Sequence, residues 1–278
     1  MSSQNPPTVL LTNDDGIDST GIQILYEELS EFADVTVVAP SVDHSGIGRV
    51  LSFGRSVPLG TGSDSEGVEV ESSDLKHEVA YADHELGYAV EGTPCDCVIA
   101  GVTALELNPD VVVSGCNPGP NLGVTSFGRS GTVSAAVEAA RLGVPGVAVS
   151  SGEYKPTDED YQYACEFARN LIEFSLANEV FRNVDYLSLS IPTSSYRSVR
   201  LTRPVEKYGF TATDSGEKSV FEFSHAETRR TFTTAESSTD LISDREALKQ
   251  DSVSITPFQL PFTPTPTSTL KEFVDSHC

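Results

Sequence analysis

The chain has 278 residues, enough to bury one large core or a core domain with a smaller appendage. Its 18 Lys and Arg against 41 Asp and Glu leave a net charge of −23, which argues against duplex nucleic acid as a partner. An apolar content of 38% with clear periodicity argues for a folded protein and against an acidic disordered chain. So acidic a surface suits the very salty cytosol of a halophile, where screening removes self-repulsion.

Five cysteines are spread along the chain without the even spacing of a disulfide framework. This odd count, without a signal peptide, predicts reduced thiols and a cytoplasmic protein. No apolar run reaches the roughly 18 residues of a membrane span, so we expect no membrane partner. Cys95 and Cys97 lack the second pair or nearby His that would complete a zinc site.

The most informative segment is Asn13-Asp14-Asp15-Gly16, directly behind an apolar run at residues 9–12. The run predicts a buried strand, and the glycine ends it. Two adjacent carboxylates therefore emerge at the carboxyl end of a first strand, where open α/β sheets bind ligands. Because the two repel each other, the pair favours a hard divalent cation bound by oxygen. The alternative is a loop that only caps the next helix, since Asp-Asp-Gly is common turn chemistry.

Helix and strand patterns then alternate along the chain. Apolar residues at 22, 25, 29 and 32 recur at helical spacing behind Ser19 or Thr20 as the cap. A second buried strand is predicted at 34–39, and β-hairpins beside the sheet at 49–90. The later elements are a helix at 93–99, a strand at 110–114, a helix at 132–142, a strand at 144–150, a helix at 158–179 and a strand at 186–191. This order predicts the α/β class with a doubly wound, mostly parallel sheet.

From about residue 199 the pattern changes to short alternating segments at 199–205, 219–224 and 229–234, which predict β-ribbons projecting from the core. A returning strand is predicted at 251–257, followed by an extended Pro-rich tail and a last short helix. We divide the chain into an α/β core at 1–198, with a hairpin insertion at about 49–90, and a β-arm and C-terminal oligomerisation segment at 199–278. Long arms often exchange between subunits, so we expect an oligomer.

Three core strands lead to side chains that carry oxygen. Asp14 and Asp15 follow the first strand, Ser45 follows the second, and Asn117 follows the third. Carboxylate, hydroxyl and amide oxygens suit Mg²⁺ or Mn²⁺, whereas thiolate or imidazole would favour zinc or copper. Ser45 and Asn117 alone are typical turn residues, but the shared sheet edge favours a metal site.

Ser130-Gly131-Thr132 opens the helix predicted at 132–142. Backbone N–H groups and the positive end of the helix dipole there would form a phosphate seat beside the metal. The alternative is an ordinary helix cap. The neighbouring Gly123, Gly128, Arg129 and Ser130 approach the phosphate loop G-x4-G-K-[ST]. Arg129 replaces the Lys and no strand directly precedes Gly123, so we reject an ATPase or GTPase.

Six segments carry these features in one order through nearly the whole chain. They are LLTNDDGIDSTGI at 10–22, VVAPSVDHSG at 37–46, EGTPCDCV at 91–98, PDVVVSGCNPGPNLG at 109–123, SGTVSAAVEAARLGVPGVAVS at 130–150 and VSITP at 253–257. Together they resemble the SurE family, the survival-protein nucleotidases. The resemblance implies a Rossmann-like core with projecting β-arms that assembles as a homodimer or homotetramer.

The resemblance also implies a metal-dependent phosphatase, a 5′-nucleotidase acting on nucleoside 5′-monophosphates. Some members also accept 3′-nucleotides or short polyphosphate. One divalent cation per subunit, Mg²⁺ or Mn²⁺, would be held by the residues that match the family's metal ligands, namely Asp14, Asp15, Ser45 and Asn117. Asp14 would be catalytic, as nucleophile or by activating water. The phosphate-binding positions correspond to Asn13, Asn121, Ser130, Gly131 and Thr132.

The segment at 123–130 departs from the family pattern. The usual Gly-x-Asp is absent, the stretch is one residue longer, and Arg129 stands where the family has Tyr or His. Two other classes stay open beside the phosphatase. One is a phospho-acceptor module, although Asn117 stands where an acceptor Asp would be expected. The other is a non-catalytic nucleotide-binding protein on the same fold.

Overall fold

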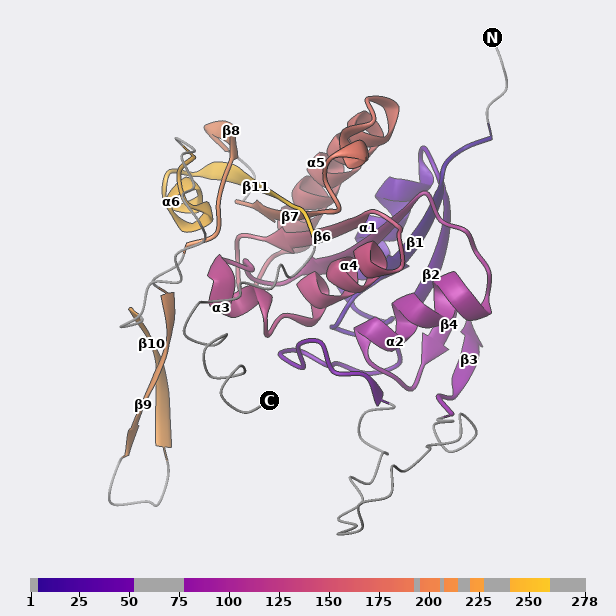
Figure 1. Ribbon diagram of the computed structural model, residues 1–278, viewed down its shortest axis with the longest axis horizontal. Helices are drawn as coiled ribbons and strands as arrows, with labels where there is room; N and C mark the ends of the chain where they lie inside the picture. Colours follow the sequence, from indigo (N-terminus) through magenta and orange to yellow (C-terminus); the bar gives the residue numbers. More distant parts are fainter. Residues whose placement is uncertain are drawn as a thin grey trace, which may run out of the picture.

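The structure is a computed structural model that describes residues 5–52, 78–192, 196–205, 208–214, 221–227 and 241–260. Within these residues, nine strands form one sheet in the order β3-β4-β2-β1-β5-β6-β7-β11-β8 (Figure 1). In that order the strands are Tyr81–His84, Gly87–Val90, Asp34–Pro40, Thr8–Thr12, Val111–Asn117, Gly146–Ser151, Tyr186–Ile191, Ser252–Phe258 and Ser198–Leu201.

The middle of this sheet is parallel. β1 pairs with β2 on one side and with β5 on the other, so that Val9 lies opposite Val35 and Val111. β6 and β7 extend the parallel order, whereas β11 runs antiparallel to β7 and β3 runs antiparallel to β4. Strands covered on both faces need continuous apolar runs, and those of β1 and β5 supply them. The predicted α/β fold with a mostly parallel sheet is confirmed.

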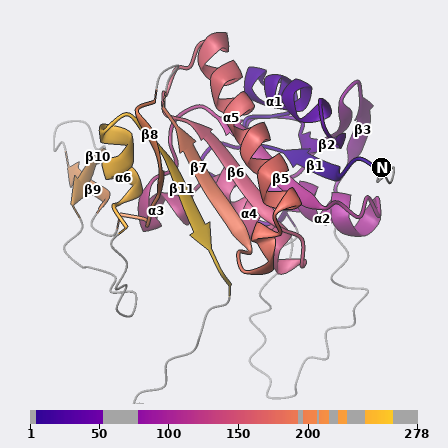
Figure 2. The same cartoon turned by 90° about the horizontal axis from the view of Figure 1, so that it is seen from above.

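Helices cover both faces of the sheet. On one face, α1 (Thr20–Ser30) and α5 (Asp158–Ala177) lie side by side over Val9 and Leu11 (Figure 2). On the other, α2 (Pro94–Ile99) and α4 (Gly131–Arg141) cover Leu10. Successive β1 side chains therefore enter opposite cores, as the two-residue period of a strand requires. The remaining helical segments are η3 (Ala100–Ala104), α3 (Gly123–Phe127), η4 (Val180–Arg182) and α6 (Asp244–Lys249).

The predicted elements agree with the structure to within a few residues, and the differences have local causes. The strand predicted at 110–114 continues to Asn117 through an irregular register with β6. The short helices α3 and α6 were not predicted, because each is only five or six residues long and carries little periodic signal. Of the hairpins predicted at 49–90, the β3–β4 pair is present, and residues 53–77 lie outside the described residues.

The arm is a two-stranded antiparallel ribbon of β9 (Tyr208–Asp214) and β10 (Phe221–Glu227), which projects from the core in Figure 1. The segment predicted as a ribbon at 199–205 instead contributes β8 to the main sheet, where it pairs in parallel with β11. The ribbon predicted at 229–234, the Pro-rich tail and the last helix lie outside the described residues. None of the helices in the described ranges is long and apolar enough to cross a membrane.

Asp244, the first residue of α6, connects the segment after β8 to the start of α3. Its side chain is 1% exposed and accepts hydrogen bonds from the backbone N–H groups of Gly123 (2.7 Å), Val205 (3.0 Å) and Arg245 (2.7 Å). Burial raises the pKa of Asp244, and these three donors oppose the rise. One buried carboxylate thus connects segments that lie more than a hundred residues apart.

We predict that Asp244→Ala lowers the free energy of unfolding by about 3 kcal/mol, because the N–H groups of Gly123 and Val205 lose a buried acceptor. Asp244→Asn keeps one acceptor oxygen and should lose less. The measurement is urea unfolding in molar salt, with exposed Asp34→Ala as the control, for which the change should stay within about 0.5 kcal/mol. Equal stability of Asp244→Ala and the wild type would contradict this role.

Candidate active site

A cavity of about 390 Å³ opens at the carboxyl ends of the parallel strands. The segments after β1, β2 and β5 all reach it, which is the position expected for a ligand site in an open α/β sheet. Its walls include all four residues predicted as metal ligands and two of those predicted to bind phosphate. These six are Asp14, Asp15, Ser45, Asn117, Asn121 and Ser130.

Asp14 is almost fully buried and held from two sides. Its Oδ1 atom accepts a hydrogen bond from Thr132 Oγ1 at 2.6 Å, and its backbone oxygen accepts one from His44 N at 2.7 Å. Burial raises the pKa of Asp14, while the hydroxyl and backbone of Thr132 lower it. The first turn of α4 therefore stabilises the ionised carboxylate, as a helix N-terminus does for any anion.

The negative charge of Asp15 is stabilised by fewer hydrogen bonds than that of Asp14. Burial, followed by the charges of Asp14 and Asp43, raises the pKa of Asp15 to about 7. Its Oδ2 atom is buried and, among the described residues, has no hydrogen-bond partner, and the same holds for Oδ1 of Asn13. Buried acceptors are rarely left unpaired without a functional reason. This corner of the cavity has the properties of a binding site for positive charge.

Ser45 lies in the loop that follows β2 and is exposed. Its backbone N–H and its hydroxyl both donate to Asp43 Oδ1, at 2.7 and 2.6 Å. Asp43 therefore orients Ser45 and adds a third carboxylate near the buried pair. Asp43 was not among the residues predicted from the sequence, although an Asp two residues before a Ser is a recognisable turn pattern.

Asn117 lies at the end of β5, just past the register irregularity. Its Nδ2 atom donates to the backbone oxygens of Pro118 (3.2 Å) and Gly119 (2.6 Å). The amide nitrogen is thus used by the loop, and the side-chain oxygen is the atom available to a ligand. Asn121 is held in a similar way, by a hydrogen bond from its Nδ2 to Ser150 Oγ at 3.0 Å.

Three of the predicted substrate residues lie behind the cavity wall. Asn13 donates through Nδ2 to the backbone oxygen of Gly16 and to Ser19 Oγ, both at 2.8 Å, which closes the turn after β1. Gly131 and Thr132 contact Asp14. Ser130 reaches the cavity and also caps α4, because its Oγ accepts from Val133 N at 3.1 Å. The cap and the phosphate-seat interpretations of this helix start are therefore compatible.

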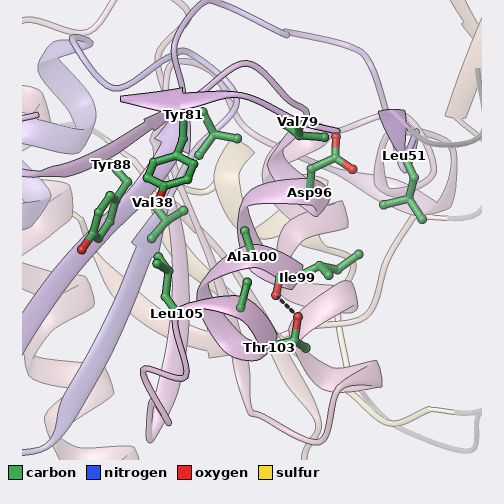
Figure 3. Close-up of a pocket in the computed structure, with 12 residues that line it drawn as sticks. Val38, Leu51, Val79, Tyr81, Tyr88, Asp96, Ile99, Ala100, Thr103 and Leu105 are labelled. Carbon is green, nitrogen blue, oxygen red and sulfur yellow. Dashed lines mark hydrogen bonds between the residues drawn. The ribbon is translucent and has the colours of Figure 1, made fainter. Parts of the chain in front are cut away.

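Arg129, Ser126 and Tyr154 also line the cavity. The sequence marked Arg129 as the replacement for the Lys of a phosphate loop and as a departure from the family pattern, and no motif marks Tyr154. A second cavity of about 400 Å³ lies elsewhere, between the β2–β4 edge of the sheet and the α2–η3 segment (Figure 3). Its walls are mainly apolar, with Val38, Tyr88 and Leu105 among them, and it shares no lining residue with the first cavity.

The donor set indicates which metal could bind. In the described ranges, no three His, Cys, Asp or Glu side chains gather as a metal site. The cavity instead combines two carboxylates with hydroxyl and amide oxygens, a set that suits a hard cation such as Mg²⁺ or Mn²⁺ and not zinc. The unpartnered Asp15 oxygen and the raised pKa of both aspartates fit such an ion.

Gly131 is required by the close approach of α4 to Asp14. A β-carbon there would lie 2.6 Å from the β-carbon of Asp14, an atom that cannot rotate away. We predict that Gly131→Ala lowers the free energy of unfolding by about 2 kcal/mol, although Ala is the better helix former. The measurement is urea unfolding in molar salt. Gly128→Ala is the matched control, since its nearest neighbour would be 4.0 Å away. A Gly131→Ala variant as stable as wild type would disprove the close contact.

The family model described as Survival protein SurE matches residues 9–211. The 5′-nucleotidase SurE of Natronomonas pharaonis is 45% identical over 75% of this chain and 77% of its own, and that of Haloquadratum walsbyi is 36% identical over 92% and 91%. Such relatives come mostly from halophilic archaea, in keeping with the acidic composition. The crystal structure of the SurE protein from Aquifex aeolicus superimposes with a TM-score of 0.70 at 27% identity, covering 97% of this chain and all of that one. The chain belongs to the SurE family.

Proposed function

We propose that this protein is a metal-dependent 5′-nucleotidase that hydrolyses nucleoside 5′-monophosphates to nucleoside and phosphate. Membership of the SurE family and the names of its relatives support nucleotidase activity. The observation that carries the proposal is the adjacent pair Asp14 and Asp15 at the cavity beyond the ends of β1 and β5. Asp14 is almost fully buried, and the buried Oδ2 atom of Asp15 has no hydrogen-bond partner among the described residues. 3′-Nucleotides and short polyphosphate are further substrates to test, because they present the same terminal phosphate.

One divalent cation, Mg²⁺ or Mn²⁺, would be held by Asp14, Asp15, Ser45 and Asn117. When bound, it would neutralise phosphate oxygens and polarise the phosphorus toward attack. It would also be the largest local charge in the cavity, which would let a protein with a net charge of −23 bind an anionic substrate there.

The side chains around this site have distinct tasks. Asp14 is the catalytic residue, as nucleophile or as the base that takes a proton from water. Thr132 is a positioning residue, because it fixes Asp14 from behind without lining the cavity. Ser130 and Asn121 present polar groups to the phosphate. Arg129 is the one cationic side chain among the cavity-lining residues of the described chain, and it would provide positive charge for the phosphate.

We further propose that the protein acts in the cytoplasm as a homodimer or homotetramer. The support is the ribbon of β9 and β10, which extends beyond the main sheet and offers the kind of arm that subunits exchange (Figure 1). Size-exclusion chromatography with light scattering in molar salt measures the subunit count directly.

We predict that Asp15→Asn abolishes both hydrolysis and the response to metal. Mn²⁺ at a hundredfold excess over its Kd should raise the Tm of the wild type by about 5 °C and leave that of Asp15→Asn unchanged. Phosphate release from AMP, with and without a chelator, reports the activity. Asp18→Asn removes an equal charge from an exposed side chain nearby and is the control.

Full turnover by Asp15→Asn would show that the proposed ligand set is wrong. The same assay separates the alternative functions. A non-catalytic nucleotide-binding protein would release no phosphate, and a phospho-acceptor would accumulate a stable acyl-phosphate after treatment with a phosphodonor.

We predict that Arg129→Ala raises the KM for AMP about tenfold, because a charge-assisted hydrogen bond to phosphate is lost. Arg129→Lys keeps the charge, so its KM for AMP should lie between those of the wild type and Arg129→Ala. Steady-state kinetics at constant salt measure the effect, with Arg182→Ala as a control, since Arg182 is exposed and pairs with Glu179. An unchanged KM in Arg129→Ala would show that the guanidinium does not bind substrate.

A further inference from the structure

Tyr154 is an unusual residue to find in the wall of a polar cavity. It lies just after β6, and its 72% exposure is the highest of the large apolar side chains that the structure describes. Tyr154 is also the one aromatic residue that lines the cavity containing Asp14 and Asp15, as far as the described chain extends. An exposed aromatic ring keeps apolar surface in water, so its position beside a polar site calls for an explanation.

The ring is seated on the loop that carries Asn117. Gly119 has a φ of +92°, and a β-carbon there would lie 2.6 Å from Cδ1 and 2.9 Å from Cε1 of Tyr154. Only glycine leaves room for this contact in that conformation. The Asn117 Nδ2 bond to the backbone oxygen of Gly119 holds the same loop. One part of the ring therefore rests on a fixed backbone, and the rest stays accessible.

No contact inside the described chain uses the accessible part of the ring. Tyr81 pairs edge to face with Tyr88, and Tyr196 pairs with Tyr163 and Phe167, whereas no aromatic partner or hydrogen bond within the described ranges involves Tyr154. A planar apolar surface near a phosphate site matches the two parts of a nucleotide, a flat base and an anionic group. A cavity of about 390 Å³ is within the usual range for small-molecule sites.

We propose that Tyr154 forms the nucleobase subsite, on which the base of the substrate stacks while the phosphate lies at the Asp14–Asp15 end of the cavity. This inference rests on the proposed nucleotidase function and identifies the residue that distinguishes a nucleotide from a simple sugar phosphate. Stacking on an aromatic ring tolerates every base, because each base has a π-face. Purines offer more stacking area than pyrimidines, so the site favours purine nucleotides.

The apolar cavity in Figure 3 is the other place where a base could bind, since Tyr81 and Tyr88 line it. It is a poorer candidate, because it shares no lining residue with the phosphate end. Its one carboxylate, Asp96, already accepts hydrogen bonds from Thr93 N at 2.8 Å and Ser52 Oγ at 2.6 Å. Tyr81, which is 63% exposed, therefore provides a matched control for Tyr154.

The test compares AMP with ribose 5-phosphate, which carries the same phosphate and no base. Tyr154→Ala should raise the KM for AMP about tenfold with kcat within twofold, and leave both parameters for ribose 5-phosphate unchanged. Tyr154→Phe keeps the ring and should behave as wild type. Tyr81→Ala should leave KM and kcat unchanged for both substrates. Equal changes for the two substrates in Tyr154→Ala, or an unchanged KM for AMP, would overturn the subsite.

Calorimetric titration with adenosine provides a readout that does not depend on turnover. The wild type and Tyr154→Phe should bind adenosine about tenfold more tightly than Tyr154→Ala, and equal affinities would overturn the subsite. If the wild type released no phosphate from AMP, the proposed function would fail. The adenosine titration would then still decide whether Tyr154 binds the base.

Discussion

Two adjacent carboxylates, one almost fully buried and one half-buried, are the constraint on which the rest of this site depends. Asp14 and Asp15 repel each other and have lost much of their hydration, as the raised pKa of both shows. The surrounding structure supplies partial compensation through Thr132, the first turn of α4 and the loop after β2. Asp14 receives more of this stabilisation than Asp15, whose buried Oδ2 atom has no hydrogen-bond partner among the described residues. The cation proposed at this site would complete the balance, and the arrangement that weakens the isolated fold would then favour metal binding.

The net charge of the whole molecule places a further requirement on this site, because the substrate is also an anion. A net charge of −23 opposes the approach of a nucleotide, and low salt strengthens that opposition because screening weakens. Binding therefore requires positive charge at the cavity itself. Arg129 provides one such charge, and the cation proposed at Asp14 and Asp15 provides the other.

Local patterns predicted the core of the fold and the acidic end of the site. The apolar run before Asp14 and the acidic pair itself are contiguous in sequence, and strand order brings Asn117 to the same edge. What could not be predicted depends on contacts between distant segments. Asp244 bonds Gly123 across more than a hundred residues, and Tyr154 faces the cavity because it packs on Gly119. Neither contact leaves a periodic or motif signal.

The two ends of the cavity differ in how well their residues tolerate substitution. At the phosphate end, the β-carbon of Asp14 leaves no space beside Gly131, and Thr132 is committed to Asp14, so most substitutions there disturb the buried pair. Arg129 and Tyr154 are exposed and stand on loops. Under the roles proposed for them, replacing either one would change what the cavity binds and leave the core packed. The family chemistry can therefore stay constant while substrate preference varies. Arg129, where this chain departs from the family pattern, lies at this exposed end.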